Sequence, residues 1–103
     1  MTFQITRQDI ETGAAWTSHF YGLSRLESLT VEASYILTDR NKDHLDSPET
    51  KAWLEQFFPS SLEEAEKVKD DFHDLHDKKV KTEDDRLRRD AAYDEFISGR
   101  NAS

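Results

Sequence analysis

The chain has 103 residues, 35% of them hydrophobic and 35% charged, and its 22 acidic and 14 basic residues give a net charge of −8. This length suits one domain, and the composition indicates a modest core with long polar faces, because globular domains usually contain about 45–50% apolar and about 25% charged residues. The negative charge argues against direct binding to nucleic acid or to an anionic membrane, and the absence of cysteine excludes disulfides and thiol chemistry.

The first predicted helix lies between Thr6 and Gly22. Thr6 can cap its start together with Asp9, and Gly22 suits the left-handed conformation that ends many helices. Gly13, inside this segment, costs about 1 kcal/mol relative to alanine, which indicates a close helix crossing at this position. The residues that share one face of this helix, and that we expect to meet the core, are Ile10, Ala14, Thr17, Phe20 and Tyr21.

Residues 24–38 carry two conflicting patterns. Ser24 and Glu27 form a second capping box. An apolar helical face follows, made of Leu26, Leu29, Ala33, Ile36 and Leu37. A strand is instead indicated by the alternation of Leu29, Val31, Ala33, Tyr35 and Leu37. We predict a helix, because the capping box marks its start and no other segment offers a partner strand of similar quality.

A polar connector at residues 39–46 leads to a short helix that Ser47 caps and Pro48 begins. Proline is favourable at the first helical position, because the N–H that it lacks has no partner within the helix there. We expect Pro59 to end this helix. The expected apolar body of the helix is Ala52, Trp53, Phe57 and Phe58.

Residues 60–98 are predicted to form an acidic helical segment with one thin apolar face. Ser60 or Ser61 can cap its start. The apolar residues then follow at a heptad-like spacing and define a surface that we name the apolar seam: Leu62, Ala65, Val68, Phe72 and Leu75. The spacing fails at Lys79 and Thr82. Thr82 can cap a separate last helix with Asp85, or one long helix can continue through it, and the sequence allows both.

These elements predict an all-α fold, a small bundle of four or five helices with a long acidic C-terminal helix or helical hairpin. Residues 1–103 form a single domain in this prediction. Its parts are an aromatic-rich helical core at 1–59, the acidic helical segment at 60–98 and a frayed tail at 99–103. The acidic helical segment contains too few apolar residues to be buried on all sides, which favours a role in contact with another molecule.

The function that this pattern favours is protein binding. We expect a small acidic adaptor, regulator or inhibitor that docks on a larger protein with a basic surface. The apolar seam is the predicted partner-binding surface, and it can also pair two copies in a homodimer. Four further aromatic side chains are expected to be exposed contacts, because tyrosine and other aromatics are favoured at binding surfaces: Tyr35, Phe58, Tyr93 and Phe96.

A second hypothesis within binding is a DNA mimic that inhibits a nucleic-acid-handling protein, such as a phage counter-defence factor. Its phosphate-like charges would be Asp70, Asp71, Asp74, Asp77, Glu83, Asp84 and Asp85. Lysine and arginine residues are interleaved with these acids at spacings of three or four residues, which favours pairing and argues against dedicated mimicry. The comparison with counter-defence factors is an analogy that no motif supports.

A hypothesis from another class is a metal-dependent helical enzyme. Its candidate ligands line one side of the acidic helical segment: Glu66, Asp70, His73 and Asp77. Imidazole and carboxylate groups one helical turn apart can share a divalent ion. A catalytic centre would also need ligands from a second element, so a solvated face is the plainer interpretation, and we expect no metal site.

Enzyme motifs are missing from the chain. Its three glycines cannot build a phosphate-binding loop or a dinucleotide fingerprint, and it has no nucleophile elbow or zinc-protease motif. No stretch approaches the roughly 18 consecutive apolar residues of a membrane span, and the N-terminus lacks the pattern of a secretory signal. We therefore expect a cytoplasmic protein without enzymatic activity or a cofactor.

Overall fold

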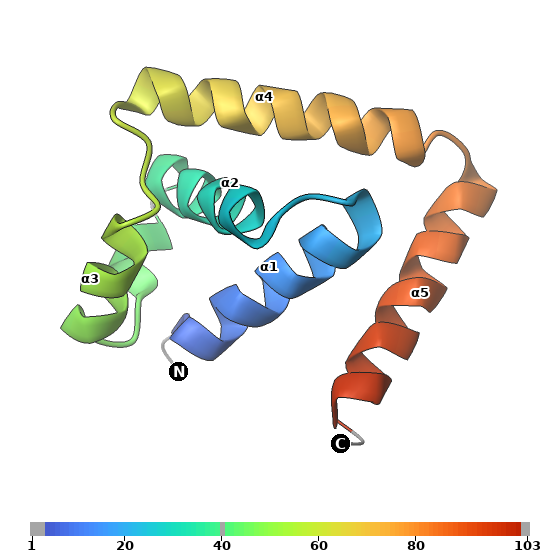
Figure 1. Cartoon of the computed structure of the whole chain (residues 1–103), viewed down its shortest axis with the longest axis horizontal. Helices are drawn as coiled ribbons and strands as arrows, with labels where there is room; N and C mark the ends of the chain where they lie inside the picture. The colour runs from blue at the N-terminus through green and yellow to red at the C-terminus, as the bar shows by residue number, and fades with distance from the viewer. Residues whose placement is uncertain (1–3, 40, 102–103) are drawn as a thin grey trace.

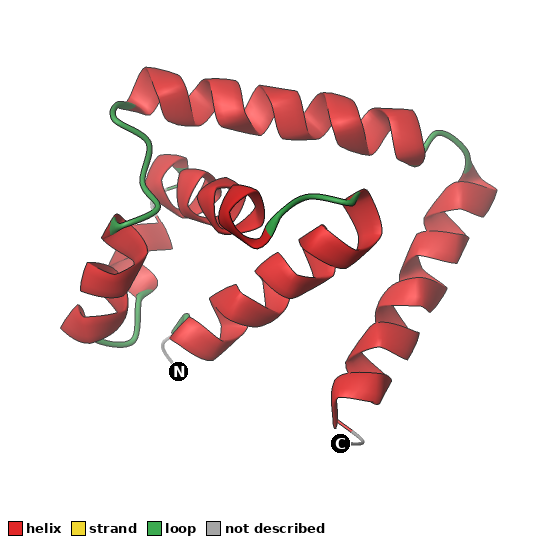
Figure 2. Ribbon diagram, in the orientation of Figure 1, coloured by secondary structure: helices red, strands yellow, loops and turns green. Residues whose placement is uncertain are grey.

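The computed structural model describes residues 4–39 and 41–101, and this part of the chain folds into five α-helices and one short 3₁₀ helix, with no β-strand (Figure 1, Figure 2). The α-helices are α1 (Arg7–Tyr21), α2 (Arg25–Thr38), α3 (Pro48–Glu55), α4 (Leu62–Lys79) and α5 (Glu83–Asn101), and the 3₁₀ helix η1 (Asn41–His44) links α2 to α3. The predicted all-α fold is confirmed. Within the described ranges, no helix is long and apolar enough to cross a membrane.

Both predicted capping boxes are present, and they fix where α1 and α2 begin. The Thr6 hydroxyl accepts a hydrogen bond of 3.1 Å from the backbone N–H of Asp9, whose carboxylate accepts one of 3.0 Å from the Thr6 N–H. Ser24 and Glu27 repeat this exchange at 3.1 Å in both directions. Gly22 follows α1 with a φ of 72°, in the left-handed region. The helix predicted for residues 24–38 is therefore confirmed over the strand alternative.

Helix α2 lies at the centre of the fold and packs against α1, α4 and η1. The Oγ atoms of Ser18 on α1 and Ser28 on α2 lie 2.7 Å apart, so the buried Ser28 hydroxyl has a hydrogen-bond partner. Lys69 on α4 donates to the Thr38 hydroxyl at 2.8 Å and to the Asp39 carboxylate at 3.2 Å, which joins α4 to the end of α2. The core cluster comes from α1, α2 and α3 and consists of Ile10, Ala14, Leu29, Ala33, Ile36 and Leu54.

Helix α3 differs from its prediction in two respects. It ends at Glu55, well before Pro59, because the chain tightens there into i→i+3 bonds, and the Phe57 N–H donates to the Leu54 carbonyl at 2.9 Å. Ala52, expected in the apolar body, is exposed, whereas Leu54 is fully buried. Two residues along a helix place these side chains on nearly opposite sides. The other members of the predicted body are partly buried against the core cluster: Trp53, Phe57 and Phe58.

The chain breaks between α4 and α5, which decides between the two alternatives that the sequence allowed. Val80 leaves the helical conformation, with a φ of −121° and a ψ of 87°. The Thr82 hydroxyl then accepts a hydrogen bond of 3.1 Å from the Asp85 N–H. In return, the Asp85 carboxylate accepts bonds of 3.2 Å and 3.1 Å from the backbone N–H groups of Thr82 and Lys81. Thr82 therefore caps a separate last helix.

Helix α5 leaves α4 at a steep angle in Figure 1, so the two helices do not lie antiparallel as a hairpin. It contacts α1 through aromatic rings, because the ring centroid of Trp16 lies 5.2 Å from that of Tyr93 and 5.6 Å from that of Phe96. None of the α5 side chains that the structure describes is fully buried. The helix extends to Asn101, beyond the start of the predicted tail, and residues 102–103 lie outside the described ranges.

Candidate functional site

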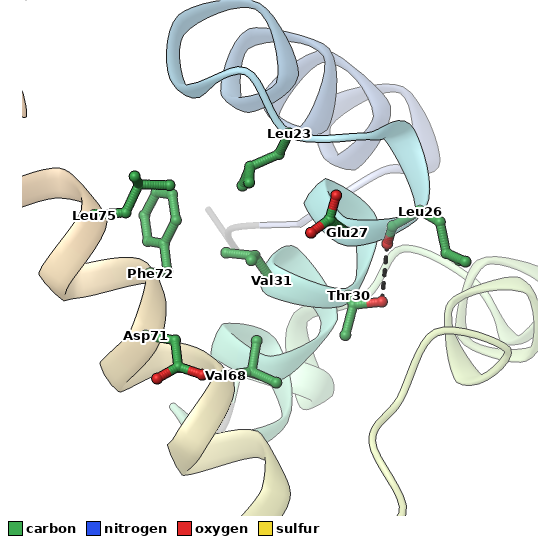
Figure 3. Close-up of a pocket in the computed structure, with 9 residues that line it drawn as sticks. All are labelled: Leu23, Leu26, Glu27, Thr30, Val31, Val68, Asp71, Phe72 and Leu75. Atoms are coloured by element: carbon green, nitrogen blue, oxygen red, sulfur yellow. Dashed lines mark hydrogen bonds between the residues drawn. The ribbon is translucent and has the colours of Figure 1, made fainter.

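An open groove with a volume of about 380 Å³ lies between the first half of α2 and the middle of α4 (Figure 3). In Figure 3, Leu23 projects from the turn between α1 and α2 into the space between the two helices. The α2–α4 groove, as we name it, is lined by Leu23, Leu26, Glu27, Thr30, Val31, Val68, Asp71, Phe72 and Leu75. Six of these nine side chains are apolar, so the groove chiefly offers hydrophobic contact.

The spacing of side chains along the two helices makes both walls of the groove apolar. On α4, Val68, Phe72 and Leu75 are four and three residues apart, so they share the face that packs against α2. On α2, Val31 is buried, whereas Leu26 is 63% exposed at the rim. The groove therefore has an apolar floor with an exposed leucine at its edge.

The ring of Phe72 is held in place from behind by two tyrosines. The ring centroid of Tyr21 lies 5.0 Å from that of Phe72, and the centroid of Tyr35 lies 6.2 Å from it, both edge-on. The Tyr21 hydroxyl also lies 2.6 Å from Nδ1 of His76, one turn further along α4. Burial raises the pKa of Tyr21, so its hydroxyl stays protonated at neutral pH. The α4 wall is therefore fixed relative to α1.

Two carboxylates stand at the groove, one on each wall. The backbone N–H of Ser24 donates to Glu27 at 3.1 Å and lowers the pKa of the Glu27 carboxyl, so Glu27 is ionised at neutral pH. Asp71 is exposed on the α4 wall. The Thr30 hydroxyl donates to the Leu26 carbonyl at 2.8 Å, which satisfies it within α2 (Figure 3). Among the nine lining residues there is no basic side chain, so the groove has a negative rim.

The apolar seam lies mainly in the contact between α4 and α2. Ala65 is fully buried, and Val68, Phe72 and Leu75 are half-buried with their outer edges in the α2–α4 groove. Leu62 is 61% exposed, at the start of α4 and outside the groove. The spacing of the seam thus located the α4 wall of the groove, and the role of this surface in binding a partner stays a prediction.

The α2 wall was not identified as a site from the sequence. Leu26 was expected on the core face of its helix, but it is 63% exposed. Val31 belonged only to the alternating pattern that favoured a strand. A signal for this wall was available in Leu23 and Leu26, two large apolar residues close to a turn, although nothing in the sequence places them opposite α4.

The four aromatic residues expected as exposed contacts lie on different parts of the molecule. Tyr35 is half-buried between Phe72 and Lys69, whose Nζ lies 5.2 Å from the tyrosine ring centroid. Phe58 is partly buried against the core cluster. On α5, Tyr93 is 43% exposed, and Phe96 is half-buried. Of these four residues, only Tyr93 and Phe96 lie together, both against the ring of Trp16.

The candidate metal ligands on α4 do not converge. His73 Nδ1 lies 3.2 Å from the Asp77 carboxylate, and Glu66 lies 3.9 Å from the ammonium group of Lys69. In the part of the chain that the structure describes, no three histidine, aspartate or glutamate side chains come together as a metal site would require. Of the four candidates, Glu66 is therefore paired with Lys69, and His73 is paired with Asp77, along one helix.

The acidic residues considered as phosphate mimics are exposed on α4, at Asp70, Asp71, Asp74 and Asp77, and lie in the first turn of α5, at Glu83, Asp84 and Asp85. Asp85 has a structural role, because the backbone N–H groups of Lys81 and Thr82 donate to its carboxylate and lower its pKa. Glu83 lies 3.8 Å from Arg86. These carboxylates therefore fall on two helices that diverge from each other.

No family model matches the chain, and no curated protein or solved structure is significantly similar to it.

Proposed function

We propose that the protein is a non-enzymatic protein-binding module, an adaptor, regulator or inhibitor, that docks on a basic protein surface through the α2–α4 groove. The observation that carries this proposal is an apolar groove with the carboxylates of Glu27 and Asp71 on its two walls.

The chemistry of the groove defines the segment that fits it. The apolar walls favour a leucine-sized side chain, and the carboxylates of Glu27 and Asp71 favour lysine or arginine beside it. An amphipathic helix that presents both meets these requirements, and such helices commonly bind in grooves between helices. The net charge of −8 supports the same kind of partner, because it attracts a basic surface from a distance and raises the rate of association.

The exposed carboxylates of α4 support a second candidate, a DNA mimic that inhibits a nucleic-acid-handling protein. Asp70 and Asp74 lie on the solvent side of α4, as does Asp77. Lys67 and Lys78 are exposed on the same helix and reduce its net negative charge, so we place this candidate second. A mimic would compete with DNA for its target and would lose affinity steeply as salt increases, whereas docking through the α2–α4 groove would depend on Leu26.

The test of the groove is a titration with a labelled synthetic helical peptide that carries leucines along one face and lysines beside them. Binding is followed by fluorescence anisotropy, and a peptide with glutamates in place of the lysines serves as the control. The wild-type protein should bind the lysine peptide and not the glutamate peptide, because only the lysines complement Glu27 and Asp71.

Two leucines of nearly equal exposure provide the matched variants. Leu26 at the rim is 63% exposed and Leu62 outside the groove is 61% exposed, so neither substitution disturbs the core. Leu26→Asp should weaken peptide binding by about tenfold or more, since an anchored leucine contributes at least about 1.5 kcal/mol. Leu62→Asp should leave binding unchanged. Equal binding by the Leu26→Asp variant and the wild type would exclude the groove as the docking surface.

A further inference from the structure

One segment of the chain has the same chemistry that the α2–α4 groove selects. Residues 86–89, on the first turns of α5, read Arg-Leu-Arg-Arg and place three arginines together, directly after the acidic residues Glu83, Asp84 and Asp85. Leu87 is 58% exposed at the centre of this segment, which we name the basic leucine segment. An exposed leucine between arginines is the kind of anchor that complements an apolar groove with a negative rim.

Two of the three arginines of the basic leucine segment, Arg86 and Arg88, are exposed and can exchange partners. Arg86 pairs with Glu83 at 3.8 Å, and both side chains are largely exposed. Arg88 is exposed. Exposed pairs of this kind contribute about 0–1 kcal/mol, so giving them up costs little. Arg89 is more enclosed and pairs with Asp90 at 3.2 Å. Arg86 and Arg88 are therefore the two charges available to a second molecule, and they match the two carboxylates of the groove in number.

We infer that the α2–α4 groove binds the basic leucine segment of a second copy of this chain, with Leu87 among the apolar walls and Arg86 and Arg88 toward Glu27 and Asp71. This inference rests on the proposed function of the groove as a docking site. Within one copy Leu87 is exposed and α5 is held against α1 at Trp16, so the segment does not occupy its own groove. Each copy carries one groove and one segment, so a reciprocal exchange between two copies satisfies both contacts in a closed dimer, whereas a one-way contact leaves one groove and one segment open.

The dimer has a consequence for binding. Because the second copy occupies the groove that a partner would use, the dimer and the partner complex exclude each other. Dissociation of the dimer then precedes capture of a basic partner, and a peptide that fills the groove should convert dimers to monomers.

The experiment is sedimentation velocity on the full chain, from micromolar to near-millimolar concentration, with circular dichroism to verify that each variant is folded. The wild type should shift from monomer to dimer as concentration rises. Leu87→Asp should weaken dimerisation by about tenfold or more. Leu62→Asp, at a leucine of similar exposure, should dimerise as the wild type does. A wild type that stays monomeric throughout, or a Leu87→Asp variant that dimerises normally, overturns the inference.

A charge exchange identifies the contact. Asp71→Lys and Arg88→Glu should each weaken self-association, because each places like charges opposite one another. Mixed in equal amounts, the two variants should form heterodimers, since the altered groove then meets the altered segment and the native groove meets the native segment. Failure of the mixture to associate overturns the assignment. The titration of the groove with the lysine peptide needs no second copy, so its outcome separates a failure of this inference from a failure of the proposed function.

Discussion

The carboxylate of Glu32 on α2 lies directly against Gly13 on α1, so close that a Cβ atom added to Gly13 would lie 3.0 Å from Oε1 of Glu32. The Glu32 side chain therefore lies beside Gly13, and the close helix crossing expected at this glycine stays a prediction. Among the described residues none donates a hydrogen bond to this carboxylate or pairs with it. Burial raises the pKa of Glu32 to about 7, because desolvation disfavours its charged form.

Glu32 should make the stability of the protein fall as pH rises. The folded-state pKa of about 7 exceeds the ordinary value of 4.5, so between these two values the folded protein binds more protons than the unfolded chain. The stabilisation present at low pH is then lost as pH rises toward and through 7, by up to about 3 kcal/mol from this group alone. Glu32→Gln should abolish this dependence on pH. Above neutral pH, the variant should therefore have a higher free energy of unfolding than the wild type. Urea unfolding of both proteins across a pH series checks this, and parallel pH profiles would contradict it.

Gly13→Ala should stabilise α1 by less than the helix propensity of alanine alone would give. That propensity gain is about 1 kcal/mol, but the new methyl group forces the Glu32 carboxylate to move. In the Glu32→Ala variant no carboxylate has to move, so the stabilisation by Gly13→Ala should be larger by at least about 0.5 kcal/mol. A double-mutant cycle of unfolding free energies measures the difference. Additive effects of the two substitutions would show that the contact between position 13 and Glu32 does not affect stability.

Tyr21→Phe should reduce stability by about 1 kcal/mol, because it removes the hydroxyl that lies 2.6 Å from His76 and joins α1 to α4. Tyr35→Phe provides the matched control. Tyr35 also packs edge-on against Phe72, but none of the described residues forms a hydrogen bond with its hydroxyl. Thermal melting of both variants should therefore show a lower melting temperature for Tyr21→Phe and an unchanged one for Tyr35→Phe. Equal losses would mean that ring packing, and not the hydrogen bond, is what the substitution disturbs.

Thr82→Ala should loosen the start of α5, because it removes the hydroxyl that caps the Asp85 N–H at 3.1 Å. The expected result is faster hydrogen exchange of the backbone amides at residues 83–86, with those of α2 unaffected. Ser98→Ala, an exposed hydroxyl later in the same helix, is the control and should exchange as the wild type does. Unchanged exchange in the first turn of α5 would show that the cap is dispensable.

The helix boundaries were predictable because the signals that set them are local. Thr6 with Asp9, and Ser24 with Glu27, lie within one turn of each other, so their pairing depends only on the chain between them. Gly22 likewise needs no distant residue to adopt a left-handed conformation. These features identify where the first two helices begin and where the first one ends, whatever the rest of the fold does.

The packing of the helices was less predictable, because it depends on residues far apart in the chain. Leu26 and Leu29 lie on one apolar stripe, yet Leu26 is exposed and Leu29 is buried, because the neighbouring helices cover only part of α2. Leu54 lies in the core although Trp53 and Phe57 are larger and more conspicuous in the sequence. The groove needs both α2 and α4, so only its α4 wall could be identified from the spacing of the apolar seam.

The break in the helix at Val80, and the attachment of α5 to α1 through aromatic rings at Trp16 and His19, divide the molecule into two unequal parts. The interior is formed by α1, α2 and α3, with α4 packed against α2, whereas α5 contributes no fully enclosed side chain among those described. Detachment of α5 would thus leave that interior intact, and its free energy should be well below that of global unfolding. Trypsin cleaves after lysine and arginine. Lys79 and Lys81 flank the junction and Arg86, Arg88 and Arg89 lie in the first turns of α5, so trypsin should cut at the junction and within α5 before it digests the remainder.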